Sequence, residues 1–121
     1  MTNSVLLYVS DAPASTRFYS KLLGLEPVEA GQTFAMFILP SGLGLGLWGR
    51  AGVEPQAAGA PGSSEIGFKV EQPDEVDALH GEWVEKGAEI LLAPTELDFG
   101  RTFVALDPDG HRLRVYTVNE G

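Results

Sequence analysis

The sequence predicts an α+β protein that consists of two tandem βαβββ modules, residues 1–49 and 63–121, within one domain of 121 residues. Two observations carry this prediction. The turn Pro40-Ser41-Gly42 is matched 68 residues later by Pro108-Asp109-Gly110, which indicates an internal repeat. Residues 50–62 are rich in Ala, Gly and Pro without apolar periodicity, as is typical of a linker. Further residues match at the same offset: Leu45 with Leu113, Leu47 with Val115, and Trp48 with Tyr116.

The elements of the first module follow from local signals. The apolar run from Val5 to Val9 predicts a strand. A helix is expected next, because Asp11 is a good N-cap residue, apolar side chains follow at helical spacing, and Gly24 supplies a C-terminal stop. Residues 33–39 and 43–48 are then expected to be strands on either side of the Pro40-Ser41-Gly42 turn.

The second module repeats this order. The sequence predicts a strand from Glu65 to Val70 and a helix that Pro73 opens and Gly87 ends. Short strands are expected at residues 88–92, 101–106 and 111–118. The inward stripe of the helix is predicted to contain Val76, Leu79, His80 and Trp83. We therefore expect Trp83 to belong to the core, His80 to lie at the core boundary rather than act as a base, and His111 to be exposed.

Composition and charge exclude several classes of function. The chain has no cysteine, so disulfides, thiolate nucleophiles and cysteine-based metal sites are excluded. Seventeen acidic residues against eight basic ones give a formal charge of −9. A nucleic-acid-binding protein needs a positively charged surface, so this class is excluded. No signal peptide and no apolar run long enough to cross a bilayer are visible, so a cytoplasmic protein is expected.

Alternation along the predicted strands separates an apolar face, expected under the helices, from a second face of mixed chemistry. Glycines within a strand often mark a close approach, and we expect them to leave room for a ligand between aromatic side chains. The alternative is a glycine-rich strand that only curves the sheet. The second face is expected to carry Ser4, Leu6, Tyr8, Gly44, Gly46, Trp48, Glu65, Gly67, Lys69, Arg112, Arg114 and Tyr116.

Two sets of motifs stand near the two ends of the chain: Val9-Ser10-Asp11, Phe18-Tyr19 and Leu22-Leu23-Gly24 near the start, and Phe103 with Asp107-Pro108-Asp109-Gly110 near the end. At this separation they resemble the vicinal oxygen chelate superfamily, which includes glyoxalase I, extradiol dioxygenases and bleomycin-resistance proteins. The resemblance covers nearly the whole chain. It implies paired βαβββ modules that form a partly open, barrel-like sheet around a cavity. It also implies a homodimer, in which modules of different chains often complete each cavity.

The resemblance also implies where a divalent metal would bind. The family's ligand positions fall on Ser4, Gly46, Glu65 and Arg114, and only Glu65 offers a suitable donor. No metal and no other cofactor are therefore expected, and Glu65 is expected to pair with Arg114 instead.

Four further features are informative: Leu47-Trp48, Ser64-Glu65-Ile66-Gly67, Glu82-Trp83 and the run from Phe99 to Phe103. In these features the chain resembles, among metal-free members, the phenazine antibiotic resistance proteins most, and such proteins work by sequestering a planar drug. We therefore expect an aromatic small-molecule ligand and no catalytic residue. The alternative is a metal-independent isomerase or lyase that uses Glu65 as acid or base beside Arg114. A metal-dependent lyase is a third possibility, against which the missing ligands argue. The expected ligand contacts are Trp48, Tyr8, Tyr116, Glu65, Arg114, Ser4, Gly46, Gly67 and Phe99.

Overall fold

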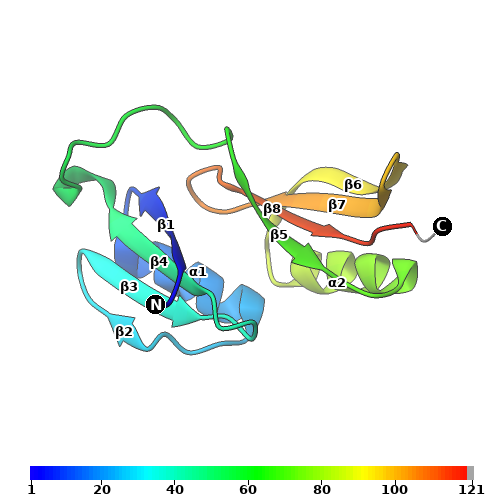
Figure 1. Ribbon diagram of the computed structural model, residues 1–121, viewed down its shortest axis with the longest axis horizontal. Coiled ribbons are helices and arrows are strands. Elements are labelled where there is room, and N and C mark those ends of the chain that lie inside the picture. The colour runs from blue at the N-terminus through cyan, green and yellow to red at the C-terminus, as the bar shows by residue number, and fades with distance from the viewer. Residues whose placement is uncertain (120–121) are drawn as a thin grey trace. The chain divides into compact units, whose positions relative to one another are not determined.

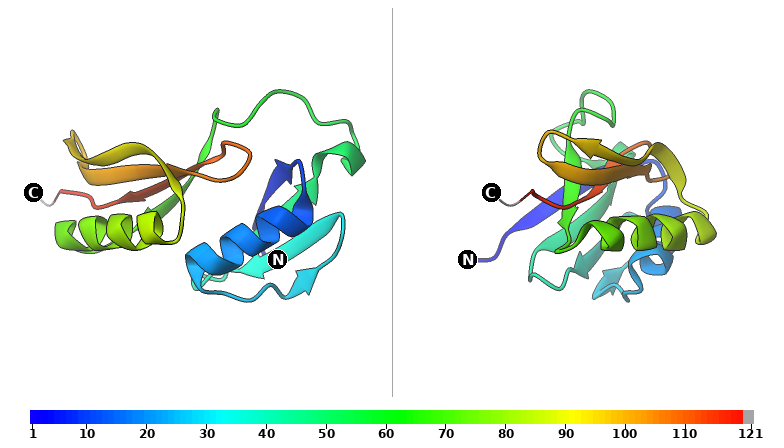
Figure 2. Two further views of the ribbon diagram at one scale, coloured as in Figure 1. Left: turned by 180° about the vertical axis from the view of Figure 1, so that it is seen from behind. Right: turned by 90° about the vertical axis from the view of Figure 1, so that its right-hand side faces the viewer.

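The computed structural model describes residues 1–119, and the chain divides into two compact units. The first unit runs from Met1 to Gly59 and the second begins at Ala60. Each unit contains one four-stranded mixed sheet with one α-helix packed against it (Figures 1 and 2). Neither α-helix of the described residues is long and apolar enough to span a bilayer.

In the first unit, the strand order is β1-β4-β3-β2. Strand β1 pairs with β4 in parallel, and the other neighbours are antiparallel. The elements are β1 (Ser4–Val9), α1 (Ala12–Leu23), β2 (Glu29–Ala30), β3 (Phe34–Ile38), β4 (Gly44–Gly49) and the 3-10 helix η1 (Arg50–Gly52).

The second unit repeats this topology, with the order β5-β8-β7-β6 and a parallel β5–β8 pair. The predicted α+β class with two βαβββ modules is confirmed, and each sheet is open rather than a closed barrel. The elements are β5 (Glu65–Lys69), α2 (Pro73–Glu85), β6 (Glu89–Leu97), β7 (Gly100–Leu106) and β8 (Arg112–Tyr116).

Both helices begin at identifiable caps. The Asp11 carboxylate accepts a hydrogen bond from the Ala14 amide at 3.1 Å, and Gly24 closes α1 in the left-handed conformation, as predicted. Helix α2 has a cap that was not predicted: Oε2 of Glu75 accepts from the backbone N–H of Gln72 at 3.0 Å.

The apolar sheet faces lie under the helices. Trp83 is 3% exposed, and its ring meets those of Phe68 and Phe103 edge-on at 5.7 and 5.4 Å, which confirms it as a core residue. His80 is half-buried and packs edge-on against Phe103 at 5.4 Å, in agreement with its predicted boundary position. The buried sheet residues of the two units include Leu7, Val9, Leu45, Leu47, Ile66, Leu113 and Val115.

Two predictions about local structure are wrong. The strand expected at residues 88–92 continues to Leu97, because Pro94 lies at a register irregularity, where a missing N–H is tolerated. His111 is half-buried rather than exposed, because its backbone N–H donates to the Asp107 carboxylate at 2.9 Å and draws the turn inward.

Candidate functional site

A hollow of about 530 Å³ lies on the open face of the second sheet, a volume within the range of roughly 300–1,000 Å³ that small-molecule pockets occupy. Its residues come from alternate positions of β5 and of β8 and its extension, because successive side chains of a strand point to opposite faces. Phe99, from the β6–β7 turn, closes one side. We call this site the β5–β8 hollow; it is lined by Glu65, Gly67, Phe99, Arg114, Tyr116 and Val118.

An ion pair forms the polar side of the β5–β8 hollow. Nε of Arg114 donates to Oε1 of Glu65 at 2.6 Å, and the two side chains are 19% and 35% exposed. Nη1 of Arg114 also donates to Oγ1 of Thr102 at 3.2 Å. Thr102 is fully buried and donates its own hydroxyl to the Val115 carbonyl, which fixes the oxygen that receives the guanidinium. The predicted partly buried pair between Glu65 and Arg114 is confirmed.

Two aromatic rings form the apolar side. Phe99 and Tyr116 meet edge-on with ring centroids 6.0 Å apart. A Cβ at Gly67 would lie 3.1 Å from Cε1 of Tyr116, so the glycine makes room for that ring. The backbone carbonyl of Phe99 accepts a hydrogen bond from the backbone N–H of Asn119 at 2.7 Å, which connects the β6–β7 turn to the segment after β8.

The first unit holds the other predicted contacts on the open face of its own sheet. The ring of Trp48 lies edge-on to Tyr8 at 6.3 Å and to Phe34 at 6.5 Å, and all three side chains are half-buried. Ser4 lies beside Gly44 in the parallel β1–β4 pair and is exposed.

The expectation that the glycines of β4 leave open space above the sheet is wrong. A Cβ at Gly46 would overlap Cδ2 of Leu6 and would lie 3.3 Å from Phe34 and 3.4 Å from Met36. These three flexible side chains fill the place that the missing side chain leaves. Gly46 is accordingly buried, and Trp48 borders a covered surface rather than an open glycine floor.

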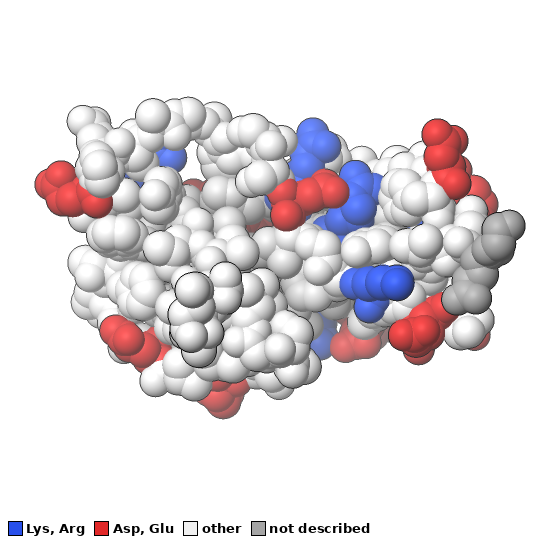
Figure 3. Space-filling view, viewed as in Figure 1, with Lys and Arg blue, Asp and Glu red and all other residues white. Residues whose placement is uncertain are grey.

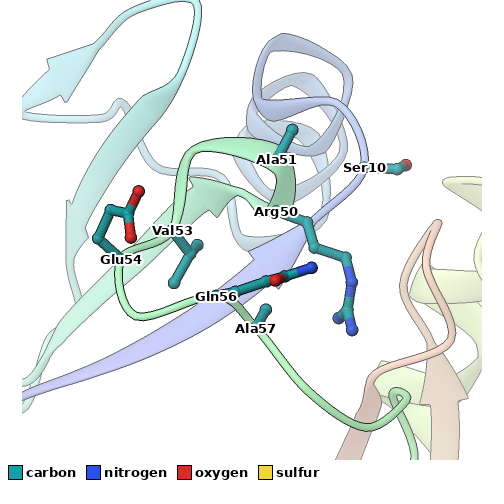
Figure 4. A pocket seen from close by; sticks show the side chains of 7 residues that line it. All are labelled: Ser10, Arg50, Ala51, Val53, Glu54, Gln56 and Ala57. Carbon is teal, nitrogen blue, oxygen red and sulfur yellow. The ribbon is translucent and has the colours of Figure 1, made fainter.

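A second hollow, of about 600 Å³, is formed largely by the linker that follows β4 (Figure 4). Arg50 is held there by a 2.7 Å hydrogen bond from Nη2 to the Gly59 carbonyl. No aromatic side chain lines this linker hollow, so it suits a flat ring system less well than the β5–β8 hollow. Its lining residues are Ser10, Arg50, Ala51, Val53, Glu54, Gln56 and Ala57.

The family's metal positions do not fit a divalent cation in this chain. The only carboxylate among them, Glu65, already receives the Arg114 guanidinium at 2.6 Å, and a second cation there would be repelled. Ser4 offers only its hydroxyl, which is a weak metal ligand, and Gly46 has no side chain to offer. Within residues 1–119, no cluster of three or more His, Asp or Glu side chains is arranged to hold a metal ion.

Sequence reasoning missed three residues around these sites: Thr102, Val118 and Phe34. The internal repeat contained a signal for two of them, since Phe34 and Thr102 stand 68 residues apart. Each pairs across the sheet with an aromatic residue, Phe34 with Trp48 and Thr102 with Tyr116. Val118 continues the alternation of β8 by one step beyond its last paired residue.

Comparisons with known proteins agree with this architecture. A phenazine antibiotic resistance protein, EhpR of Enterobacter agglomerans, is 34% identical over 116 residues, which cover 93% of this chain and 88% of that protein. A protein from Agrobacterium tumefaciens solved by NMR is 45% identical and superposes with a TM-score of 0.89, covering 99% of this chain and 98% of that one.

A glyoxalase-related enzyme from Fulvimarina pelagi is 24% identical, with a TM-score of 0.83 over 97% of this chain and 87% of that one, and shares the fold. The sequence profile of the Glyoxalase/Bleomycin resistance protein/Dioxygenase superfamily matches residues 2–115. This chain therefore belongs to the Glyoxalase/Bleomycin resistance protein/Dioxygenase superfamily.

Proposed function

We propose that this protein binds and sequesters a planar aromatic small molecule, an antibiotic of the phenazine type, without a metal ion. One observation carries the proposal: the β5–β8 hollow combines the edge-on rings of Phe99 and Tyr116 with the Glu65–Arg114 ion pair. Apolar walls with a few placed polar groups are what a flat heteroaromatic ligand requires. Trp48 and Tyr8 are proposed as further contacts.

The similarity to the Enterobacter agglomerans protein supports the ligand class. At 34% identity over most of both chains, the two proteins share a fold, and a related ligand is a reasonable inference. We further propose that the protein acts in the cytoplasm as a homodimer.

Sequestration and catalysis make different demands on Glu65. In the described structure its carboxylate is engaged by Arg114, and neither histidine lines the β5–β8 hollow. This arrangement would suit ligand binding better than proton transfer. An isomerase or lyase that uses Glu65 would still require turnover, which an experiment can measure directly.

The test is a titration of phenazine into the purified protein by calorimetry, followed by chromatography of the ligand after prolonged incubation. We expect saturable binding with one class of site and full recovery of unchanged ligand. Loss of the ligand with formation of a product would favour the enzyme. No binding of phenazine or of any other planar aromatic antibiotic would contradict the proposal.

Metal content is a separate prediction of this proposal. Because only Glu65 among the family's ligand positions has a suitable donor, elemental analysis should find no stoichiometric zinc, nickel, iron or manganese. Dialysis against a chelator should leave the phenazine Kd unchanged. One tightly bound ion per chain, with binding that a chelator abolishes, would contradict it.

A further inference from the structure

Basic side chains gather on the open face of the second sheet, although the protein as a whole is acidic. Three of its eight lysines and arginines lie there, Lys69, Arg112 and Arg114, as the β5–β8 register shows. Figure 3 shows basic atoms near β5 and β8 with an acidic patch beside them, while the acidic side chains visible elsewhere form separate patches on a mostly uncharged surface. Glu65 is the acidic neighbour on these two strands, and neither Lys69 nor Arg112 has an ion-pair partner among the described residues. This face therefore favours an anion, in contrast to the formal charge of −9.

Arg114 directs this positive charge into the β5–β8 hollow. A guanidinium carries five N–H donors, and two of them are used, one by Glu65 and one by Thr102. Within residues 1–119, the Arg114 guanidinium makes no further hydrogen bond. The side chain is only 19% exposed, so its position is well defined, and the buried Thr102 hydroxyl holds it from below. Unused donors in a fixed position on a pocket wall are a recognition group for an acceptor on the ligand.

The acceptor that best matches this geometry is a carboxylate. Its two oxygens lie in a plane and take paired N–H donors from a guanidinium, as in bidentate Arg–carboxylate contacts. The rings of Phe99 and Tyr116 line the same hollow, so a carboxylate attached to a flat ring would meet Arg114 while the ring meets the aromatic wall. Glu65 occupies the Nε donor and leaves terminal N–H groups for this contact.

We infer that the ligand of the β5–β8 hollow is a planar aromatic carboxylate, whose anionic group is bound by the free N–H donors of Arg114. This inference rests on the proposed function and narrows it from aromatic molecules in general to anionic ones. It predicts that the β5–β8 hollow binds an anionic ligand more tightly than a neutral ligand of the same shape. This difference in affinity can be measured separately from binding itself.

The test compares phenazine-1-carboxylate with phenazine-1-carboxamide, which keeps the rings and the shape of the substituent but has no charge. The parent protein should bind the carboxylate about tenfold more tightly, the size expected for a hydrogen bond to a charged group. In Arg114→Met this preference should disappear, whatever the change in the affinity for the carboxamide itself, because only the carboxylate loses a charge-assisted contact.

Arg112→Met is the matched control. It removes a cation from the same strand and the same face, but Arg112 does not line the β5–β8 hollow. Most of the preference should remain in this variant. An equal loss in both variants would show that the general field, not Arg114, selects the ligand, and would overturn the inference.

Two further outcomes separate this inference from the proposed function. Equal binding of carboxylate and carboxamide by the parent would overturn the inference and leave aromatic binding intact. Binding of neither would overturn both. If Arg114→Met does not fold by circular dichroism, the double variant Glu65→Gln/Arg114→Met, which leaves no unpaired carboxylate, supports the same comparison.

Discussion

Trp48 and Trp83 lie in different surroundings. Replacing Trp48 should therefore reduce ligand affinity, whereas replacing Trp83 should reduce stability. Trp48 is half-buried among aromatic rings on the open face of the first sheet, whereas Trp83 is 3% exposed beneath α2. Trp48→Ala should weaken phenazine binding by about tenfold, because a stacking contact contributes about 0.5–1.5 kcal/mol beyond its burial. Trp83→Ala should instead lower the free energy of unfolding by about 3–5 kcal/mol, as expected for a large core side chain.

Calorimetric titration and urea unfolding of both variants check this prediction. The contrary result would be a Trp48→Ala protein that binds like the parent, together with a Trp83→Ala protein that stays folded and loses binding. The ligand would then lie on the helix side of the sheets, and the assignment of the open face as the binding face would be wrong.

Single residues were predictable where a strand's alternation alone decided their position. Glu65 and Arg114 were expected to meet because each falls on the open face of neighbouring strands, and they do. The filling of the space above Gly46 was not predictable in this way. It depends on the rotamers of Leu6, Phe34 and Met36, three flexible side chains on two other strands. Alternation gives the face of a residue but not the volume that its neighbours occupy.

At the level of elements, the β6–β7 turn depends on Gly100. Its φ of 152° and its close approach to the segment after β8 leave no space for a side chain, since a Cβ would overlap the Thr117 carbonyl oxygen. Gly100→Ala should therefore destabilise the protein by about 2 kcal/mol, within the range of backbone strain. It should also weaken ligand binding, because the turn carries Phe99 into the β5–β8 hollow.

Gly81→Ala serves as the matched control for this change. Gly81 lies in α2, and a Cβ there would meet nothing within 4 Å. Alanine should raise helix stability by about 0.5–1 kcal/mol. Thermal melts of both variants give the comparison, and a neutral Gly100→Ala substitution would show that the turn can move aside without cost.

A second prediction at this scale concerns the α2–β7 tie, by which we mean the ion pair between Asp77 and Arg101. Asp77 of α2 accepts two hydrogen bonds from Arg101 of β7, both at 2.8 Å. The bond from Arg101 lowers the pKa of Asp77 below its usual 3.8, so the folded state is stabilised above that pH. The contribution is lost as the pH falls through the lowered pKa. Asp77→Asn should therefore lose less stability on acidification than the parent.

Urea midpoints measured from neutral pH down into the acid range test this expectation. Glu85→Gln removes the same charge from the same helix but has no ion pair among the described residues. It should keep the acid sensitivity of the parent. Parallel curves for the parent and Asp77→Asn would show that the α2–β7 tie does not link stability to pH.

Element boundaries were predictable to the extent that capping residues mark them. Asp11 and Gly24 fixed the ends of α1, because each satisfies a backbone group that the helix leaves open. The end of β6 carried no such mark. Its last residues, Thr95 to Leu97, pair with Thr102 to Gly100 of β7, three to seven positions away in the chain and beyond two register shifts. Strand propensity alone does not show where such irregular pairing ends.

At the scale of the whole molecule, the internal repeat made the architecture predictable. Matching turns and apolar residues at a fixed offset predicted two equivalent units, and the two sheets have the same strand order. The divergence between the units was visible too, since the position of Gly46 in the first is taken by Arg114 in the second. The repeat marked the position of Thr102 but could not supply its role, which is a hydrogen bond to Arg114 that Phe34 cannot make.

The assembly of the molecule yields the last prediction. Strand β1 ends the first sheet, pairs with β4 alone in that sheet, and exposes two apolar side chains, with Val5 37% and Leu6 43% exposed. An exposed apolar edge strand favours association with another chain, and a closed homodimer would cover it. Light scattering at micromolar concentration should therefore give twice the monomer mass.

Leu6→Lys should shift the protein towards monomer, because a charge opposes pairing at an edge while the aliphatic stem still covers Gly46. Val28→Lys, at a residue that is 67% exposed outside the strands, is the control and should remain dimeric. A parent protein that is monomeric at every concentration would contradict the prediction, and an unchanged dimer in Leu6→Lys would place the interface elsewhere.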